Sequence, residues 1–439
     1  MEWSQLLTTR RTGQPVDKIK QRRTEFQRDY DRMIFTPAFR RLQNKTQVFP
    51  LPGSVFVHNR LTHSIEVASL GRSLGNNIGN RLFEAKEAPN EALELGSIVS
   101  AACLAHDMGN PPFGHSGEKA ISHYFQNNER GAELLHNSGL SEIEKQDMLN
   151  FDGNANTFRL LSHSFKGRRE GGMALTYPTV ASIIKYPRPS MGVKKFGYFQ
   201  QDKEIFESIM NQLGIPHIEG STDSYCRFPL VYLVEAADDI CYQLMDVEDA
   251  TRLGILSFEE AFELYKAFFD LEEDKKIIEN IPNVFKQVLD KHERIAYLRS
   301  IAIGKLIDGC TEVFWNNREE ILSGTFKVHS LVDCLHPTQA NAMKTVATLA
   351  VERIYRHRSV MEVEISGFQI ISTLLDRFIE SLMTPERYYS GLLMPFIPEQ
   401  YRPDPDASAY DKMLAAVDIV SGMTDLYAVD LYKKIQGDI

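Results

Sequence analysis

Apolar side chains recur at the spacing of an α-helix along most of this chain of 439 residues. Positions i, i+3, i+4 and i+7 are apolar in long segments, which is the pattern of buried or amphipathic helices. The helices predicted in this way cover residues 64–83, 91–107, 228–253, 257–270, 342–358, 368–383 and 413–435. Strand-like alternation is short and rare, and its best examples are RSVMEVEI (358–365) and YYSGLLMP (388–395). We therefore expect a mostly α fold.

Three stretches rich in Gly, Pro and Asn interrupt the helical pattern, at 108–114, 187–198 and 386–406. Hydrophobic residues make up 43% of the chain, which is ample for a real core and argues against disorder. From the composition shifts and breaks we predict three parts. These are an N-terminal extension over residues 1–20, a main domain over 21–260 and a helical C-terminal region over 261–439.

The net charge of −10 is unevenly distributed along the chain. Residues 1–60 contain 12 Lys/Arg and 5 Asp/Glu, so a basic segment precedes an acidic remainder. Such a segment favours a local site for phosphate-bearing ligands, and a solvated basic helix is the alternative. An acidic protein of this kind is not coated with nucleic acid over its whole surface.

The five cysteines are scattered and form no C-x-x-C pair. This usage is typical of a reduced cytoplasmic protein rather than of a disulfide framework or a thiolate metal site. The N-terminus lacks the layout of a signal peptide, and the longest apolar runs are too short to span a bilayer. We expect a cytoplasmic protein without membrane association.

Three helical segments carry candidate metal ligands: His63, the adjacent pair His106–Asp107, and the acids of VEAADDICYQLMDVED (234–249). Two imidazoles and two carboxylates suit Mn²⁺, Fe²⁺, Ni²⁺ or Zn²⁺ more naturally than Mg²⁺. A lone histidine such as His63 is more often a satisfied core residue than a ligand. The His–Asp pair changes this balance, because a buried aspartate needs a partner or an ion.

The last of these segments also carries an acidic stripe. Asp238, Tyr242, Asp246 and Asp249 follow at i, i+4, i+8 and i+11, which places them on one face of a helix. Like charges at this spacing destabilise an isolated helix, so the stripe needs an explanation. It is either exposed to solvent or lines a pocket that holds a cation and a hydroxylated ligand.

Three motifs, HNRLTHSIEV, LAHDMGNPPFGHSGE and EAADDICYQLMDVED, follow in this order along the chain. Together they resemble the HD-superfamily deoxynucleoside triphosphate (dNTP) triphosphohydrolases of the bacterial dGTPase type. The likeness runs from about residue 20 to 435. It also includes FRRLQNKTQVFPL (39–51), FDGNANTFRLL (151–161), LTYPTVASIIKYP (175–187), KKFGYF (194–199) and IVSGMTDLYAVDLY (419–432).

The resemblance implies a helical HD-domain core with an additional C-terminal helical region, and a metal site formed by His63, His106, Asp107 and Asp238. Asp238 rather than Asp239 matches the family, because the family's ligand precedes the tyrosine by four residues and the next aspartate by eight. The implied cofactor is a divalent metal ion, Mn²⁺ or Mg²⁺ first, with Fe²⁺, Ni²⁺ and Zn²⁺ as alternatives.

The resemblance also implies catalytic and substrate-binding residues. His115 and Glu118 match a catalytic pair in which the carboxylate orients an imidazole that moves protons. Whether His115 acts as base or, as we favour, as proton donor stays open. Substrate contacts are implied for Arg60 and Lys195 with the triphosphate, Gln43 and Asp246 with the sugar 3′-hydroxyl, and Tyr242 with the deoxyribose. Lys185 and Arg159 form a second set of cations, which make either phosphate contacts or structural ion pairs.

The implied reaction is metal-dependent hydrolysis of a dNTP, with dGTP as the leading substrate, to deoxynucleoside and inorganic triphosphate by attack of water at the α-phosphorus. The alternatives are another HD nucleotide phosphohydrolase, acting on monophosphates, alarmones or cyclic nucleotides, and a non-catalytic dNTP-binding regulator. Family members also imply a homo-oligomer, either tetramer or hexamer, and activation by a second dNTP or by single-stranded DNA. The C-terminal region is expected to contribute to the substrate pocket and to oligomer contacts.

Overall fold

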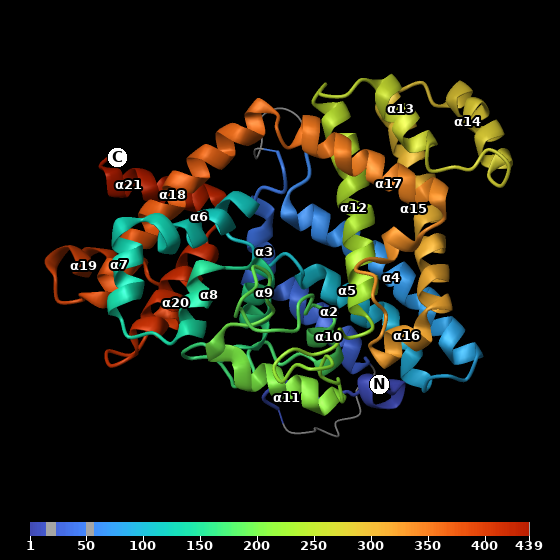
Figure 1. The fold of residues 1–439 in the computed structure, drawn as a ribbon. Coiled ribbons are helices and arrows are strands. Elements are labelled where there is room, and N and C mark those ends of the chain that lie inside the picture. The colour runs from blue at the N-terminus through green and yellow to red at the C-terminus, as the bar shows by residue number, and fades with distance from the viewer. Residues whose placement is uncertain (15–22, 50–56, 439) are drawn as a thin grey trace.

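The computed structural model describes residues 1–14, 23–49 and 57–438 (Figure 1). The predicted boundary between residues 20 and 21 lies outside these ranges. The described residues form helices joined by turns, with three isolated β-bridges and no β-strand. The prediction of a mostly α fold is therefore confirmed. No helix among the described residues is long and apolar enough to cross a membrane, and all five cysteines are free thiols.

The centre of the molecule is built mainly from helices of the N-terminal half (Figure 1). They are α1 (Trp3–Leu6), α2 (Glu25–Phe35), α3 (Pro37–Arg41), α4 (Arg60–Glu84), α5 (Leu95–Ala105), α9 (Gly153–Ser162), α10 (Tyr177–Ala181), α11 (Lys203–Leu213) and α12 (Val231–Arg252). α5 is apolar on every side and almost wholly buried, which places it at the centre of the core. It packs against α2, α4 and α12.

α4 and α5 lie unusually close because glycines replace side chains at their contact. A Cβ on Gly75 would lie 2.7 Å from the carbonyl oxygen of Leu95, and one on Gly79 would lie 2.2 Å from that of Ala92. Only glycine leaves room for two backbones at this separation. This close packing fixes where the N-terminal end of α4 stands relative to the C-terminal end of α5.

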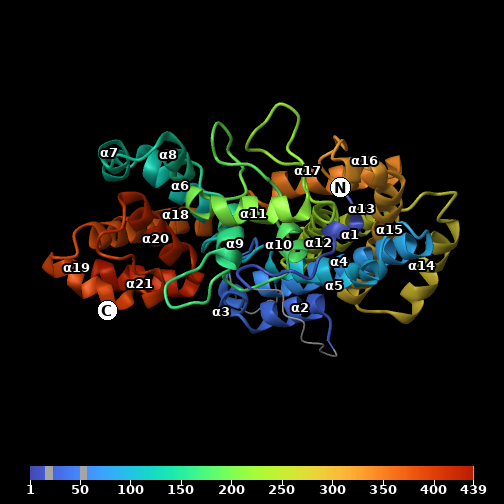
Figure 2. The ribbon, with the colours of Figure 1, turned by 90° about the horizontal axis from the view of Figure 1, so that it is seen from below.

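Two groups of helices, most of them from the chain after residue 260, pack on both sides of this centre (Figures 1 and 2). One group lies beside α4 and α12: α13 (Phe258–Lys266), α14 (Lys275–Gln287), α15 (Lys291–Asn316), α16 (Arg318–Ser323) and α17 (Pro337–Leu349). Within it, α13, α15 and α17 contact α12, and α15 also contacts α4. The other group lies on the opposite side: α6 (Gly114–Asn127), α7 (Glu129–Asn137), α8 (Glu142–Leu149), α18 (Arg358–Met383), α19 (Tyr388–Leu393), α20 (Ala409–Ser421) and α21 (Asp425–Gln436). Short 3₁₀ turns and one π-turn complete the described chain: η1 (Leu42–Asn44), η2 (Asn90–Glu94), η3 (Gln200–Asp202), η4 (Leu331–Cys334), the π-turn η5 (Ala350–Ile354), η6 (Met394–Phe396) and η7 (Glu399–Tyr401).

Both strand candidates are wrong, because each lies in a helix. RSVMEVEI begins α18, whose start is fixed by the His357 side chain accepting a hydrogen bond from the backbone N–H of Ser359. YYSGLLMP forms α19 and the start of η6, so the predicted break at 386–406 also contains helical turns. Short alternating patterns carry less information than the tertiary packing that places them.

Two helix predictions need smaller corrections. The predicted helix 368–383 is the second part of α18, which begins at Arg358. The predicted helix 413–435 is interrupted at Gly422–Thr424 and forms α20 and α21, with Thr424 as N-cap of the second helix. The threonine side chain accepts the N–H of Tyr427 and so starts a new helix in a new direction.

Candidate metal centre and active site

The two predicted histidine ligands come together at the end of the α4–α5 contact. Asn59 and Thr62 form a capping box that begins α4 and places His63 in its first turn. His106 directly follows the last residue of α5. The two rings lie edge to face with their centroids 5.3 Å apart. Close packing of the helices thus pairs two imidazoles that are 43 positions apart in the sequence.

The orientation of His106 leaves one ring nitrogen for a ligand. Its Nδ1 lies 2.6 Å from the carbonyl oxygen of Cys103, so Nδ1 carries the proton and donates it. Nε2 is buried and has no hydrogen-bond partner among the described residues, although it faces the carboxylates of Asp238 at 3.4 Å and Asp107 at 3.6 Å. A ring nitrogen that faces two carboxylates, while the other ring nitrogen donates to a backbone carbonyl, is the arrangement of a metal-binding imidazole.

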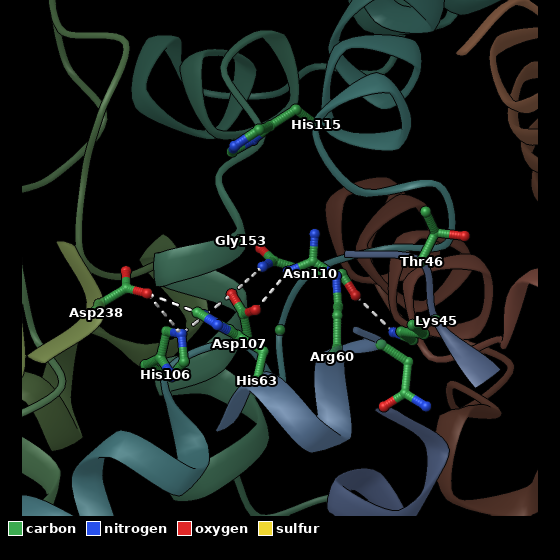
Figure 3. Close-up of polar contacts among 12 residues, drawn as sticks. Lys45, Thr46, Arg60, His63, His106, Asp107, Asn110, His115, Gly153 and Asp238 are labelled. Carbon is green, nitrogen blue, oxygen red and sulfur yellow. Dashed lines mark hydrogen bonds and ion pairs between the residues drawn. The ribbon is translucent and has the colours of Figure 1, made fainter. Parts of the chain in front are cut away.

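α12 supplies the fourth predicted ligand. Oδ1 of Asp238 lies 3.0 Å from Nε2 of His63 (Figure 3). The neighbouring Asp239 points elsewhere and accepts a hydrogen bond from Ser330 at 2.6 Å. Asp238, and not Asp239, therefore shares a site with the two imidazoles.

Asp107 is held from two sides. Arg60, the first residue of α4, donates from Nη1 to one carboxylate oxygen at 2.5 Å, and Asn110 donates from Nδ2 to the other at 2.5 Å. Arg60 is buried, so this ion pair is shielded from water. Asn110 was not predicted as a site residue. It lies in the LAHDMGN motif, three residues after Asp107, and this short spacing could have identified it as a partner of that carboxylate.

We call His63, His106, Asp107 and Asp238 the inner cluster. Ligand atoms of the first three lie within 4.8 Å of one another, and Asp238 contacts both imidazoles. Burial alone would lower the pKa of His106, but the adjacent Asp107 and Asp238 raise it to about 9. Burial would raise the pKa of Asp238, yet the imidazoles hold it well below its usual value. A site that draws positive charge so strongly, with two imidazole and two carboxylate donors, fits a divalent metal ion.

A second group of predicted residues lies at the start of α6. Nδ1 of His115 lies 3.0 Å from Oε2 of Glu118, and Oε1 of Glu118 accepts the backbone N–H of Gly153 at 2.8 Å. Lys195 approaches Glu118 at 3.9 Å and Asp152 at 3.5 Å. We call His115, Glu118, Asp152 and Lys195 the outer cluster. In Figure 3, His115 stands apart from the inner cluster.

The outer cluster combines buried acids with exposed bases. Glu118 and Asp152 are buried, whereas the side chains of His115 and Lys195 are 80% and 44% exposed. Burial would raise the pKa of Glu118, but the hydrogen bond from His115 and the charge of Lys195 hold it below its usual value. A carboxylate that stays ionised can orient the imidazole, so Nε2 of His115 is left to exchange a proton with a ligand.

The acidic side chains along α12 have protein partners rather than facing solvent. Asp246 accepts a hydrogen bond from the hydroxyl of Tyr355 at 2.7 Å, and Asp249 lies 2.9 Å from Nδ1 of His58. Both acids are buried. Because Tyr355 is 109 positions from Asp246, no local spacing could have identified it. The interpretation of the stripe as a solvent-exposed face is therefore excluded.

The remaining predicted substrate residues are not joined to either cluster by a hydrogen bond among the described residues. Tyr242 lies one helical turn from both Asp238 and Asp246 on α12, and burial raises the pKa of its hydroxyl to about 12. Gln43 is exposed in η1.

The second set of cations makes structural ion pairs. Arg159 is buried between Asp418, at 2.9 Å, and Asp202, at 3.0 Å. Lys185 pairs with Glu235 at 2.9 Å. The structure therefore supports ion pairs within the fold, rather than phosphate contacts, for Arg159 and Lys185.

Two family models match parts of the chain that carry this arrangement. The HD domain matches residues 60–175, which contain His63, His106, Asp107, His115 and Glu118. The phosphohydrolase-associated domain matches residues 334–434, which contain α18–α20, most of α21 and Tyr355. The chain thus has the fold of an HD-domain hydrolase, and His63, His106 and Asp107 of the inner cluster lie within the matched HD range.

Curated relatives align over essentially the whole chain. A deoxyguanosinetriphosphate triphosphohydrolase-like protein of Synechocystis is 36% identical over 100% of this chain and 99% of its own length. One from Listeria innocua is 34% identical over 100% of both chains. The deoxyguanosinetriphosphate triphosphohydrolase of Salmonella paratyphi A is 30% identical over 93% of both. The chain belongs to the family of deoxyguanosinetriphosphate triphosphohydrolases and their like.

Proposed function

We propose that this protein hydrolyses a deoxynucleoside triphosphate, with dGTP as the leading substrate, to the deoxynucleoside and inorganic triphosphate. One observation carries the proposal. A set of two imidazoles and two carboxylates, buried or partly buried, lies in the same fold as a carboxylate-oriented histidine and a lysine. Full-length similarity to proteins named for this activity supports the substrate class.

The inner cluster would hold the metal ion through Nε2 of His106, a ring nitrogen of His63 and the carboxylates of Asp107 and Asp238. We expect Mn²⁺ or Mg²⁺, and Fe²⁺, Ni²⁺ and Zn²⁺ are the other candidates. A divalent ion there would lower the pKa of a bound water and offset charge at the α-phosphate.

Two cations, Lys195 and Arg60, would bind the triphosphate. Lys195 is partly exposed beside the outer cluster. Arg60 uses Nη1 for Asp107, and Gly114 leaves space for its Nη2, because a Cβ there would lie 2.8 Å from that atom. Charge on both sides of the tripolyphosphate stabilises it as the leaving group.

His115 would handle the proton of the reaction. Nδ1 faces Glu118, so Nε2 is the atom that donates to the departing 5′-oxygen. Without Glu118 the imidazole would be free to rotate, which is why we propose Glu118 as its orienting partner.

The sugar would lie along α12. Gln43 and Asp246 would bind the 3′-hydroxyl, with Tyr355 holding the Asp246 carboxylate. Tyr242 would lie against the deoxyribose, where a 2′-hydroxyl would meet an aromatic ring. That arrangement discriminates against ribonucleotides by clash and desolvation.

We further propose that the protein is a cytoplasmic homo-oligomer, tetramer or hexamer, with residues 261–439 supplying substrate and subunit contacts. Large apolar side chains exposed on α19 and α21, Tyr388, Leu392 and Leu426, support subunit contacts on this side. A second dNTP or single-stranded DNA is the activator to test.

The decisive experiment incubates purified protein with Mn²⁺ or Mg²⁺ and, separately, each dNTP, GTP and dGMP, and resolves the products by chromatography. Deoxynucleoside and inorganic triphosphate are the expected products, and EDTA abolishes their formation. Pyrophosphate with a monophosphate, turnover of dGMP alone, or no turnover of any dNTP would contradict the proposal. Those outcomes point instead to another HD phosphohydrolase or to a dNTP-binding regulator.

A further inference from the structure

The junction between α20 and α21 contacts the loop that links the two clusters and the segment around Thr46, yet the proposed reaction gives it no role. It forms the middle of IVSGMTDLYAVDLY, from Ser421, the last residue of α20, to Asp425, the first of α21. Its contacts reach two segments that are more than three hundred residues away in the sequence.

Asp425 joins these two segments with one carboxylate. Its Oδ1 accepts the backbone N–H of Phe113 at 3.0 Å, and its Oδ2 accepts the backbone N–H of Thr46 at 2.8 Å. The residue is buried, and its charge lies in the first turn of α21, where the helix dipole stabilises an anion. Both carboxylate oxygens of Asp425 therefore accept hydrogen bonds from backbone N–H groups of these two segments.

The contact to Phe113 holds a strained part of residues 108–113, the loop between the His106–Asp107 pair and α6, which we call the HD loop. Phe113 has a φ of +62°, in the left-handed region that side chains other than glycine rarely adopt. It is the N-cap of α6 and has no side-chain hydrogen bond of its own to the helix. Such a conformation persists only where its surroundings hold it, and Asp425 supplies a hydrogen bond at this point. His115 follows two residues later, so the same contact sets where the imidazole stands.

Lys45 forms the second arm of this connection. Its buried ammonium donates to the carbonyl of Asn110 at 2.5 Å and to that of Ser421 at 2.8 Å. The side chain of Asn110 in turn donates to Asp107 (Figure 3). A path of hydrogen bonds thus runs from the end of α20 through Lys45 and Asn110 to a carboxylate of the inner cluster.

We propose that Asp425 and Lys45 are positioning residues that clamp the HD loop and the segment around Thr46 onto the C-terminal helices. Asp425 sets the position of His115, and Lys45 sets that of Asp107. This inference rests on the proposed function for its kinetic consequences. Its structural consequences, metal affinity and protection of the loop backbone, do not depend on the substrate.

Asp425→Asn tests the first arm. An amide can accept only one of the two N–H bonds with its oxygen, and it presents an NH₂ group to the other. At a temperature well below the unfolding transition, kcat for dGTP should fall about 10²-fold, as expected for displaced reacting groups. KM and Mn²⁺ affinity should stay within about twofold. The peptide covering residues 106–118 should exchange backbone hydrogen faster by mass spectrometry.

Lys45→Met tests the second arm, because it removes the ammonium and both of its hydrogen bonds but keeps a long unbranched side chain. Mn²⁺ affinity, measured by calorimetry without nucleotide, should weaken about tenfold because Asn110 no longer holds Asp107 firmly. Asp430→Asn is the matched control for both variants. Asp430 lies on α21 but is exposed and pairs only with Lys434 among the described residues, so its loss should change none of these quantities.

Normal kcat and loop exchange in Asp425→Asn, or normal Mn²⁺ affinity in Lys45→Met, would overturn the proposal. A parallel fall of kcat, metal content and folded fraction would also overturn it, because that is the signature of simple destabilisation. If the wild-type protein turns over no dNTP, the proposed function fails. The clamp is then judged on metal affinity and loop exchange alone.

Discussion

The inner and outer clusters sit in one fold but are fixed to very different degrees. The inner cluster is set by two helices in backbone contact, and each of its four side chains has a second partner or faces another member. In the outer cluster the acids are buried and the imidazole of His115 is exposed, with a single side-chain hydrogen bond to Glu118. Rigidity suits a site that must select and hold an ion, and exposure suits a group that must meet a substrate and exchange protons.

Removing an inner ligand should have the largest effect. His106→Ala deletes the one buried nitrogen that faces both Asp107 and Asp238. We expect loss of bound metal and loss of dNTP turnover to background, measured by metal analysis and product chromatography on the same sample. Asp239→Asn is the control, since the neighbouring carboxylate bonds to Ser330 and should keep both properties. If Asp239→Asn loses as much metal and turnover as His106→Ala, then Asp239 belongs to the metal site and the assignment of Asp238 alone is wrong.

Removing the imidazole of His115 should distinguish the role of the outer cluster in turnover from the role of the inner cluster in metal binding. His115→Ala should retain metal affinity, because His115 makes no contact with the inner cluster in the described structure. Turnover should fall by about 10²–10⁴, the usual contribution of a general acid or base. His123→Ala, an exposed histidine on the same helix that packs on Phe368, should stay near wild type. A loss of metal in His115→Ala would mean that the clusters are one site.

Asp246, the proposed partner of the sugar 3′-hydroxyl, differs from the acids of both clusters because its hydrogen-bond donor, Tyr355, is a neutral side chain. Burial raises the pKa of Asp246 to about 7, although the hydroxyl of Tyr355 donates to it. In the unfolded chain this carboxyl titrates near 3.8, so the folded protein binds more protons between these values. Stability from this group is therefore greatest at low pH and is lost as the pH rises from about 4 to about 7.

Asp246→Asn should remove this part of the pH dependence, as measured by thermal unfolding across that range. It should also lower kcat/KM for dGTP roughly tenfold through a weakened bond to the 3′-hydroxyl, equivalent to about 1.4 kcal/mol. A 2′,3′-dideoxy substrate is the control, because it lacks the hydroxyl and should show little difference between variant and wild type. Equal losses for both substrates would place Asp246 outside the sugar site.

Local sequence patterns predicted most of the helices, but they did not predict which distant segments come into contact. α4, α5 and α12 follow from periodicity because each buries a continuous apolar face. Asp238 was selected by the resemblance rather than by this periodicity, and it lies 3.0 Å from His63. The long α15 was missed, since its apolar positions are spread among charged residues. Tyr355 beside Asp246 and Asp425 beside Thr46 could not be found, because they meet only after distant helices have packed.

One missed signal was local. Glycines at 71, 75 and 79 recur every four residues on one face of α4, and each faces α5 or the turn before it. Such spacing indicates close helix approach, and here that approach pairs His63 with His106. The inner cluster thus depends on residues that carry no side chain, whereas the outer cluster lies beyond this contact.

Gly75→Ala tests that dependence and should have the smallest effect of the four. The new methyl group would meet the backbone of Leu95 and Gly96 at 2.7–2.8 Å, so the helices must separate. Overpacking of this kind costs about 1–3 kcal/mol, which should lower Tm and weaken Mn²⁺ affinity severalfold. Gly304→Ala is the control, because a Cβ on this glycine of α15 meets no neighbour and should raise stability by about 0.5–1 kcal/mol. If Gly75→Ala lowers Tm but leaves Mn²⁺ affinity intact, the geometry of the inner cluster is held by Arg60 and Asn110 rather than by the spacing of α4 and α5.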